Sequence, residues 1–156
     1  MSRRHRAKKR EVSADPNYES ILVHMIVNRL MKHGKKNQAY RIMYKALDEI
    51  KQVTDEDPIK TLTTACNNVK PAVEVKAKRV RGSALQVPIE VKTERGTVLA
   101  IQWILAAART RAGRNIVTKL KEELLDAANE SGGAIRKRND VKRMAEANKA
   151  FARFRF

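Results

Sequence analysis

Apolar residues recur at spacings of three and four along most of the chain, which predicts helices with one buried face. The first predicted helix spans about residues 20–33, and the second runs from the Lys35-Lys36 connection to about residue 53. The others span about residues 58–70, 94–111, 115–130 and 134–150. The first is apolar on most of its surface and leaves one polar stripe, formed by His24, Asn28 and Lys32. A helix of that kind is expected near the centre of a core.

Turn-forming residues mark the expected ends of these helices. Gly34 is predicted to cap the first helix, since glycine accepts positive φ without cost. Asp57 and Pro58 are typical of an N-cap and a first helical residue. Asp15-Pro16-Asn17 is predicted to turn the chain before the first helix.

One stretch alternates with a period of two instead, from Val73 to Val91. Alternation of this kind predicts a hairpin of two strands, with Arg81-Gly82-Ser83 as its turn. On the first strand, Lys76 and Lys78 are expected on the face opposite the valines. A two-stranded ribbon is marginal in water. We therefore expect this one to lean on the helices at its base, or on a partner along its length.

These patterns together predict a mainly α protein. The expected fold is a single-domain bundle of about six helices over residues 18–150, with one projecting β-hairpin arm at 72–91. Basic tails are expected at 1–17 and 151–156. The chain contains no internal repeat and no sign of a second domain.

Composition points to the kind of partner. The chain of 156 residues holds 34 Lys and Arg against 17 Asp and Glu, a net charge of +17. Such an excess attracts polyanions, nucleic acid first and acidic membranes second. No apolar run approaches the ~20 residues that span a bilayer, and "MSRRHRAKKR" lacks the apolar segment of a secretory signal. A soluble intracellular protein is expected, with no membrane partner.

Catalytic chemistry is not predicted. The sequence has no glycine-rich phosphate loop, and its three histidines have no metal-ligand spacing. Cys66, the single cysteine, falls on an apolar helix face and is expected to be an inert, buried thiol. The aspartates at turns are explained by capping. We therefore expect no enzyme, no metal and no cofactor.

The cations gather at four places in the sequence. Each cation that meets a phosphate releases condensed counterions, which favours binding to nucleic acid. Trp103 lies in an apolar helix and is expected in the core, so stacking of nucleic-acid bases on exposed aromatic side chains is not the expected mode of binding. Recognition of paired RNA or duplex DNA by shape and backbone fits better. The candidate residues are the tail cations Arg3, Arg4, Arg6, Lys8, Lys9 and Arg10, the helix-junction residues Lys35 and Lys36, the hairpin residues Lys76, Lys78, Arg79 and Arg81, and Arg109, Arg111 and Arg114.

Two further classes of function compete with a structural RNA-binding protein. A DNA-architectural protein also combines a helical body with basic β-arms, but it often inserts an apolar wedge that this hairpin tip lacks. An RNA-processing enzyme needs a general base near a phosphate, and no His–carboxylate pairing is apparent in the sequence.

Three segments, "LVHMIVNRLMKHGKK", "VEVKAKRVRGSALQVPIEV" and "AIRKRNDVKRMAEANKAF", resemble the family of bacterial-type ribosomal small-subunit protein seven. The resemblance covers nearly the whole chain. It implies a structural constituent of the small subunit that binds the 3′ major domain of 16S-type rRNA first and nucleates assembly of the subunit head. It also implies a place near the tRNA exit site and the mRNA path, contact with ribosomal small-subunit protein eleven, and no homo-oligomer. The expected location is a ribosome in the bacterial cytoplasm or the chloroplast stroma.

The resemblance adds candidates to the RNA surface. It implies that Arg95 on the fourth helix contacts rRNA, and Lys119 and Arg143 are further candidates. The chain also departs from the family pattern. Arg81 stands where the family usually has glycine, and Leu85 stands where an aromatic residue or histidine is common.

Overall fold

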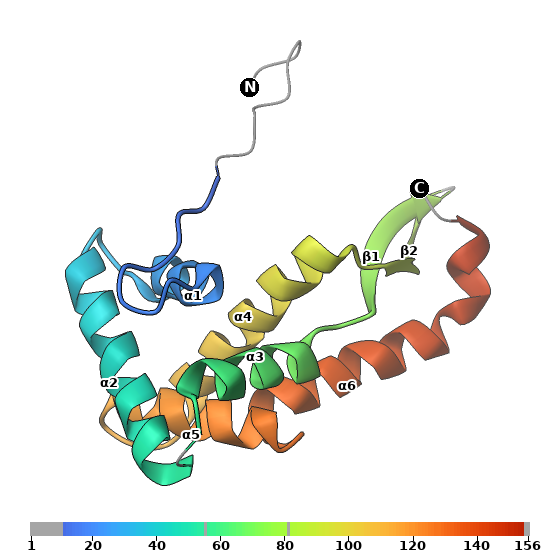
Figure 1. The fold of residues 1–156 in the computed structure, drawn as a ribbon. Helices are drawn as coiled ribbons and strands as arrows, with labels where there is room; N and C mark the ends of the chain where they lie inside the picture. Colours follow the sequence, from blue (N-terminus) through green and yellow to red (C-terminus); the bar gives the residue numbers. More distant parts are fainter. Residues whose placement is uncertain (1–10, 55, 81, 155–156) are drawn as a thin grey trace.

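The computed structural model describes residues 11–54, 56–80 and 82–154 and confirms the mainly α, single-domain fold (Figure 1). A two-stranded hairpin is inserted between the third and fourth helices. The elements in chain order are α1 (Ile21–Leu30), α2 (Lys36–Thr54), α3 (Pro58–Val69), β1 (Val73–Val80), β2 (Ser83–Glu90), α4 (Thr93–Thr110), α5 (Ile116–Ala128), α6 (Gly132–Ala147) and the 3-10 helix η1 (Lys149–Phe154).

The centre of the core is α5, which packs against α2, α3, α4 and α6. Leu120, Leu124 and Ala127 on its inner face are completely buried, as the spacing predicted. The expectation that α1 is central was wrong. Its main contacts are with α2 and α4, and Ile21 is 54% exposed. An apolar surface that wraps a ten-residue helix therefore does not require neighbours on every side.

The boundaries of two helices differ from the prediction. α1 ends at Leu30, because Met31 turns to ψ 135° and leaves the helical region. Gly34 is therefore not its cap. Instead His33 (φ 52°) and Gly34 (φ 74°) are consecutive left-handed residues in the turn before α2. At the other end of the chain α6 stops at Ala147, and η1 contains residues 151–154 of the expected C-terminal tail.

α3 begins where the sequence predicts. Pro58 is in its first turn, and the Asp57 carboxylate accepts a hydrogen bond from the backbone N–H of Ile59 at 3.0 Å. A proline loses nothing at this position, because the first N–H groups of a helix have no partner within the helix.

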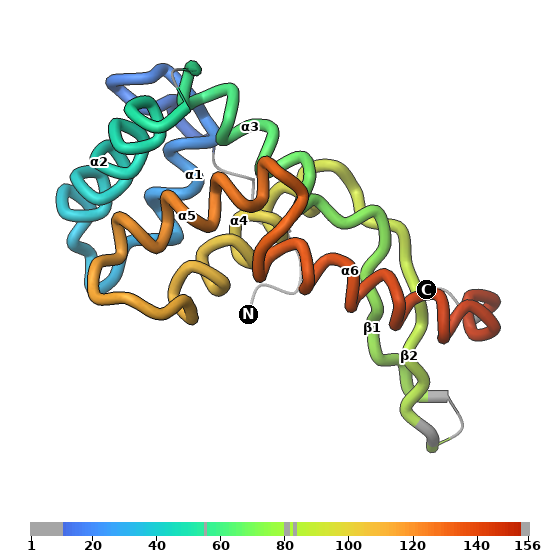
Figure 2. The backbone as a smooth tube through the Cα atoms, turned by 90° about the horizontal axis from the view of Figure 1, so that it is seen from below, coloured from blue at the N-terminus to red at the C-terminus, as the bar shows by residue number. Residues whose placement is uncertain are grey.

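The hairpin leaves the bundle beside α6 and projects beyond it (Figure 2). Its base leans on helices as expected, since α6 contacts β1 and η1 contacts β2. Val87 is completely buried there. The register pairs Lys76 with Val87 and Lys78 with Leu85. Ser83, which was expected in the turn, is already paired with Val80 as the first residue of β2, and Gly82 is in the turn before it.

The strand register decides which side chains share a face of the arm. Directly opposed residues of an antiparallel pair project to the same side, and neighbours along a strand project to opposite sides. Lys76 and Lys78 therefore share a face with the apolar residues of β2, and Arg79 lies on the other face. The arm carries cations on both of its faces. Arg81 lies outside the described residues.

Candidate nucleic-acid interface

The predicted cations gather at the two ends of α4. Arg95 is in the first turn of this helix and Arg109 in its last. Its 18 residues separate the two by about 20–27 Å. We call Lys32, Lys35, Arg109 and Arg114 the junction surface. We call Lys76, Lys78, Arg79 and Arg95 the arm surface.

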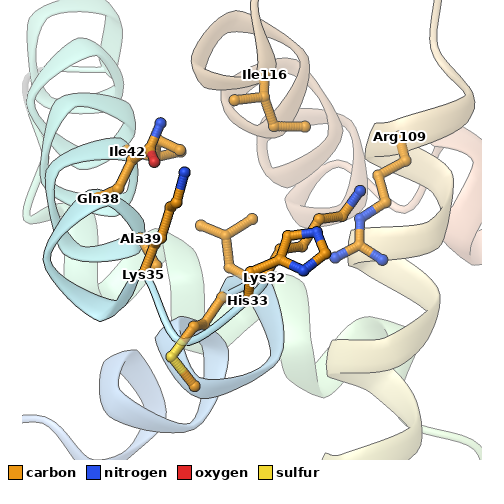
Figure 3. Close-up of a pocket in the computed structure, with 10 residues that line it drawn as sticks. Lys32, His33, Lys35, Gln38, Ala39, Ile42, Arg109 and Ile116 are labelled. Carbon is orange, nitrogen blue, oxygen red and sulfur yellow. The ribbon is translucent and has the colours of Figure 1, made fainter.

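The junction surface surrounds a hollow of about 400 Å³ between the α1–α2 turn, the end of α4 and the start of α5 (Figure 3). The two left-handed residues, His33 and Gly34, reverse the chain so that Lys32 and Lys35 line the same hollow. Arg109 reaches it from α4, and its Nη2 donates to the carbonyl of Arg29 at 3.4 Å. Residues from four helices and one turn thus converge on one site.

Lys36 has a different environment from Lys35. It is half-buried, and its ammonium lies 3.4 Å from Nε2 of His24 and 5.7 Å from the ring centroid of Tyr40. His24 was predicted on a polar stripe, but it is only 8% exposed, and its Nδ1 lies 3.2 Å from the Tyr40 hydroxyl. Lys36 therefore has partners inside the fold, and its contact with RNA stays a prediction.

The same aromatic cluster holds the segment that precedes α1. Tyr44 stacks beside Tyr40, with ring centroids 5.6 Å apart, and its hydroxyl donates to Asp15 at 2.9 Å. Asp15 is 1% exposed and also accepts from the backbone N–H groups of Asn17 and Tyr18, which confirms the predicted turn. Burial and the hydrogen bond to Asp15 raise the pKa of Tyr44, so the phenol keeps its proton. The tail cations Arg3 to Arg10 lie outside the described residues.

Arg111 is held by carboxylates of α5. Its Nε donates to Glu123 at 2.6 Å, and its other nitrogens meet Asp126 and Glu122. Burial opposes the charged form, but the hydrogen bonds to Asp126 and Glu123 outweigh it and raise the pKa of Arg111. Glu123 also accepts from the backbone N–H of Ala134 at 2.8 Å. Arg111 therefore ties α4 and α5 to the start of α6, and an rRNA contact stays a prediction.

One buried carboxylate organises the arm surface. Glu74 is 9% exposed and accepts from Arg95 Nε at 3.0 and 2.8 Å, and from Lys76 Nζ at 3.1 Å. Burial raises the pKa of Glu74, but the hydrogen bonds from Arg95 and Lys76 outweigh it, and the pKa lies below its usual range. The ion pair with Arg95 joins the base of the arm to α4. Arg79 is exposed further along the arm.

Three predicted residues remain, of which Arg114 belongs to the junction surface and Lys119 and Arg143 belong to neither surface. Arg114 is exposed in the α4–α5 connection, and Lys119 packs its aliphatic chain near Gly113. Arg143 is exposed on α6 and lines a shallow hollow with Lys142. Sequence reasoning missed three members of the junction region. These are Lys32, Gln38 and Arg41. The available signal was their spacing, because Lys32 and Gln38 lie three residues from Lys35 on either side and Arg41 lies three residues beyond Gln38.

Within the described ranges, no three His, Cys, Asp or Glu side chains are placed to hold a metal ion. No helix in that part of the chain has the length and apolar character needed to cross a membrane.

Residues 2–149 match the family model of ribosomal protein S7p/S5e. The chain belongs to this family. It is 62% identical to small ribosomal subunit protein uS7c of Tupiella akineta and 56% identical to uS7c of Ostreococcus tauri. It is 54% identical to uS7 of Synechococcus sp. (strain JA-2-3B'a(2-13)). Each match covers the full length of both chains.

Membership of the S7p/S5e family confirms the resemblance inferred from three sequence segments. It also confirms the coarse prediction of a ribosomal protein of the small subunit, in a ribosome of chloroplast or bacterial type. The family is one of ribosomal proteins and not a class of enzymes.

Proposed function

We propose that this S7p/S5e chain is a primary binder of small-subunit rRNA. Its target is the 3′ major domain, and binding there nucleates assembly of the subunit head. The observation that carries the proposal is the concentration of exposed cations at both ends of α4, around a rigid helical body. Two separated cationic surfaces on one rigid body hold two parts of a folded RNA at a fixed spacing, which is what an early assembly step requires.

The second part of the proposal concerns the neighbours of the β-hairpin arm in the ribosome. A ribbon two strands wide enters spaces from which a globular body is excluded, and this one carries cations on both faces. We place it beside the exit-site tRNA and the mRNA path, and we place ribosomal small-subunit protein eleven among the neighbours of the chain. Contacts along both faces then give the ribbon the partner that a two-stranded sheet needs for stability.

A binding comparison tests the proposal. The full chain is titrated with an rRNA fragment that contains the 3′ major domain, and with duplex DNA of equal length, at one fixed near-physiological salt concentration. Strong preference for the rRNA is expected, because affinity from charge alone is insensitive to sequence and shape. Equal affinity for both would contradict the proposal and favour the DNA-architectural alternative.

A triple substitution isolates the arm. Replacing Lys76, Lys78 and Arg79 with alanine is expected to weaken rRNA binding and to leave helical content nearly unchanged. The unfolding temperature should fall only slightly, because Glu74 loses Lys76 but keeps its ion pair with Arg95. The matched control removes three exposed cations from helix surfaces away from α4, Lys45, Lys51 and Lys60. Both variants lose the same charge. Equal affinities of the two variants would show that net charge, and not the arm, drives binding.

A further inference from the structure

The hollow on the junction surface has an apolar interior and a cationic rim. Leu30 and Ala39 are only 8% and 3% exposed and lie at its base. Met31, Ile42 and Ile116 are half-buried and form its walls, so they keep apolar area open to a ligand. A volume of about 400 Å³ is within the range of sites that bind small organic ligands.

The rim is cationic without a compensating carboxylate. Lys32, Lys35 and Arg109 line the hollow, and none of its ten lining residues is an aspartate or glutamate. Figure 3 shows Arg109 reaching toward Lys32 and His33 on one side, with Lys35 and Gln38 on the other. The cations come from two separate elements. Their charges therefore surround the opening of the hollow, whereas on an ordinary solvated helix face they would follow one helix.

The ligand that complements such a site is flat and apolar in one part and anionic in the other. A nucleotide has this character: its base has two apolar faces, and phosphates flank it on both sides. Gln38 is exposed at the rim, and its amide offers both a donor and an acceptor to the edge of a base. Proteins that recognise RNA by sequence commonly use bases that have left the stack.

We propose that this hollow receives one unstacked nucleotide of the bound rRNA, with its base between Ile42 and Ile116 and its flanking phosphates at Lys32, Lys35 and Arg109. The inference rests on the proposed rRNA binding and adds a specific site to it. Backbone contacts position an RNA without reading its sequence. A nucleotide held in this hollow fixes the register of the RNA on the junction surface.

An acidic protein segment with an apolar anchor is the competing occupant. Two features favour the nucleotide. The rim cations are spread around the opening, as phosphates on both sides of one base require. The hollow also lies on the junction surface, and the exposed Arg114 is two residues before Ile116 of its wall.

The first experiment fills the hollow without changing charge. Ile116→Trp adds an indole ring from the wall, and Gln38→Trp adds one from an exposed position on the rim. The second variant serves if the first fails to fold. Val53→Trp is the matched control, because Val53 is 62% exposed at the end of α2 and outside the hollow. Either filled variant is expected to bind the rRNA fragment about fivefold more weakly or worse, the loss of one base contact.

The second experiment identifies the nucleotide. A photoreactive benzoylphenylalanine at position 38 of the full chain is cross-linked to the rRNA fragment, and the modified nucleotide is read from reverse-transcription stops. One unpaired nucleotide is expected. Removal of its base, leaving the sugar and phosphates, should weaken binding to the original protein. The same abasic RNA should lose little more with the filled variant, because hollow and base act as one contact.

The outcomes separate this inference from the proposed function. If the original chain does not prefer the rRNA, both fail. If it does, but the filled variants bind as tightly as Val53→Trp, the nucleotide site is wrong and rRNA binding stands. The site is also wrong if the loss of affinity from filling the hollow and the loss from removing the base multiply when the two changes are combined. A cross-link to paired nucleotides or to none also overturns the site, which leaves a protein segment as the occupant.

Discussion

The guanidinium of Arg111 meets three carboxylates of α5, and one of them, Glu123, is 1% exposed. Arg111→Ala is expected to lower the free energy of unfolding by about 3 kcal/mol, because it leaves a buried carboxylate without its counter-charge. Denaturant unfolding followed by circular dichroism measures this loss. Glu122→Gln is the control. It removes a half-exposed partner 3.5 Å from Arg111 and should cost less than about 1 kcal/mol.

A double substitution separates stability from RNA binding at this residue. Arg111→Met with Glu123→Gln removes both charges, so it should recover much of the stability lost in Arg111→Ala. If its rRNA affinity then equals that of the original chain, Arg111 acts only within the fold. A single Arg111→Ala that is as stable as Glu122→Gln would contradict the structural role altogether.

Cys66 makes a simpler prediction. Burial raises the pKa of its thiol to about 12, against about 8.5 for an exposed cysteine. At pH 8 the thiolate fraction of the folded chain is then about 10⁻⁴, some 10³-fold below that of the unfolded chain. Iodoacetamide should therefore modify the folded chain at least about 10³-fold more slowly than the chain in denaturant. Mass spectrometry of the single cysteine gives both rates, and rates within tenfold of each other would contradict the burial.

These two residues show what sequence reasoning can reach at the scale of one side chain. Cys66 was predicted correctly because helical periodicity alone places it on a buried face. Arg111 and Lys36 were counted as RNA-binding candidates on charge alone, and their partners inside the fold were not predicted. Glu123 lies twelve positions from Arg111, and His24 lies twelve from Lys36. Only the packing of separate helices brings such residues together.

At the scale of the element, Glu74 couples the arm to α4. Its pKa is lowered in the folded chain, so the unfolded chain binds the proton more tightly. The ion pairs with Arg95 and Lys76 therefore stabilise the fold above the unfolded pKa of about 4.3 and stop doing so as the pH falls through the folded pKa. Glu74→Gln is expected to destabilise the chain at pH 7 and to have a shrinking effect below about pH 4.3.

Urea unfolding of both chains between pH 3 and pH 7 checks this dependence. Glu146→Gln, on the exposed surface of α6, is the control for a general effect of losing one negative charge. A Glu74→Gln effect that stays constant across this pH range would mean that the side chain stabilises by packing and not by its charge.

The hairpin also marks the limit of prediction for an element. Its existence, its approximate ends and its support by helices followed from period-two alternation and from the weakness of a lone ribbon. Which side chains of β2 share a face with Lys76 and Lys78 did not follow. That depends on which residues pair across the turn, because a change of one residue in the register moves every side chain of a strand to the other face. The pairing of Val80 with Ser83, with Gly82 (φ 88°) before Ser83, decides it here.

At the scale of the whole molecule, α4 separates the junction and arm surfaces by more than the ~8 Å over which salt at 0.15 M screens charge. The two surfaces should therefore contribute independently to rRNA binding. Helix order alone could not predict this division, because the junction surface joins residues of the α1–α2 turn, α4 and the α4–α5 connection that are distant in sequence. Most of these cations could be predicted from the sequence. Which of them lie together on one surface depends on how α1, α2 and α4 pack.

Two pairs of substitutions test this independence. Lys35→Ala with Arg109→Ala reduces the junction surface, and Lys78→Ala with Arg79→Ala reduces the arm surface without touching the Glu74 ion pairs. Each pair should lower the slope of log affinity against log salt by about 1.5, because each phosphate contact contributes about 0.7–0.9. All four substitutions together should multiply the two losses of affinity. A combined loss no greater than one pair alone would mean that the RNA engages only one end of α4, and the chain would then not hold two parts of the RNA at a fixed spacing.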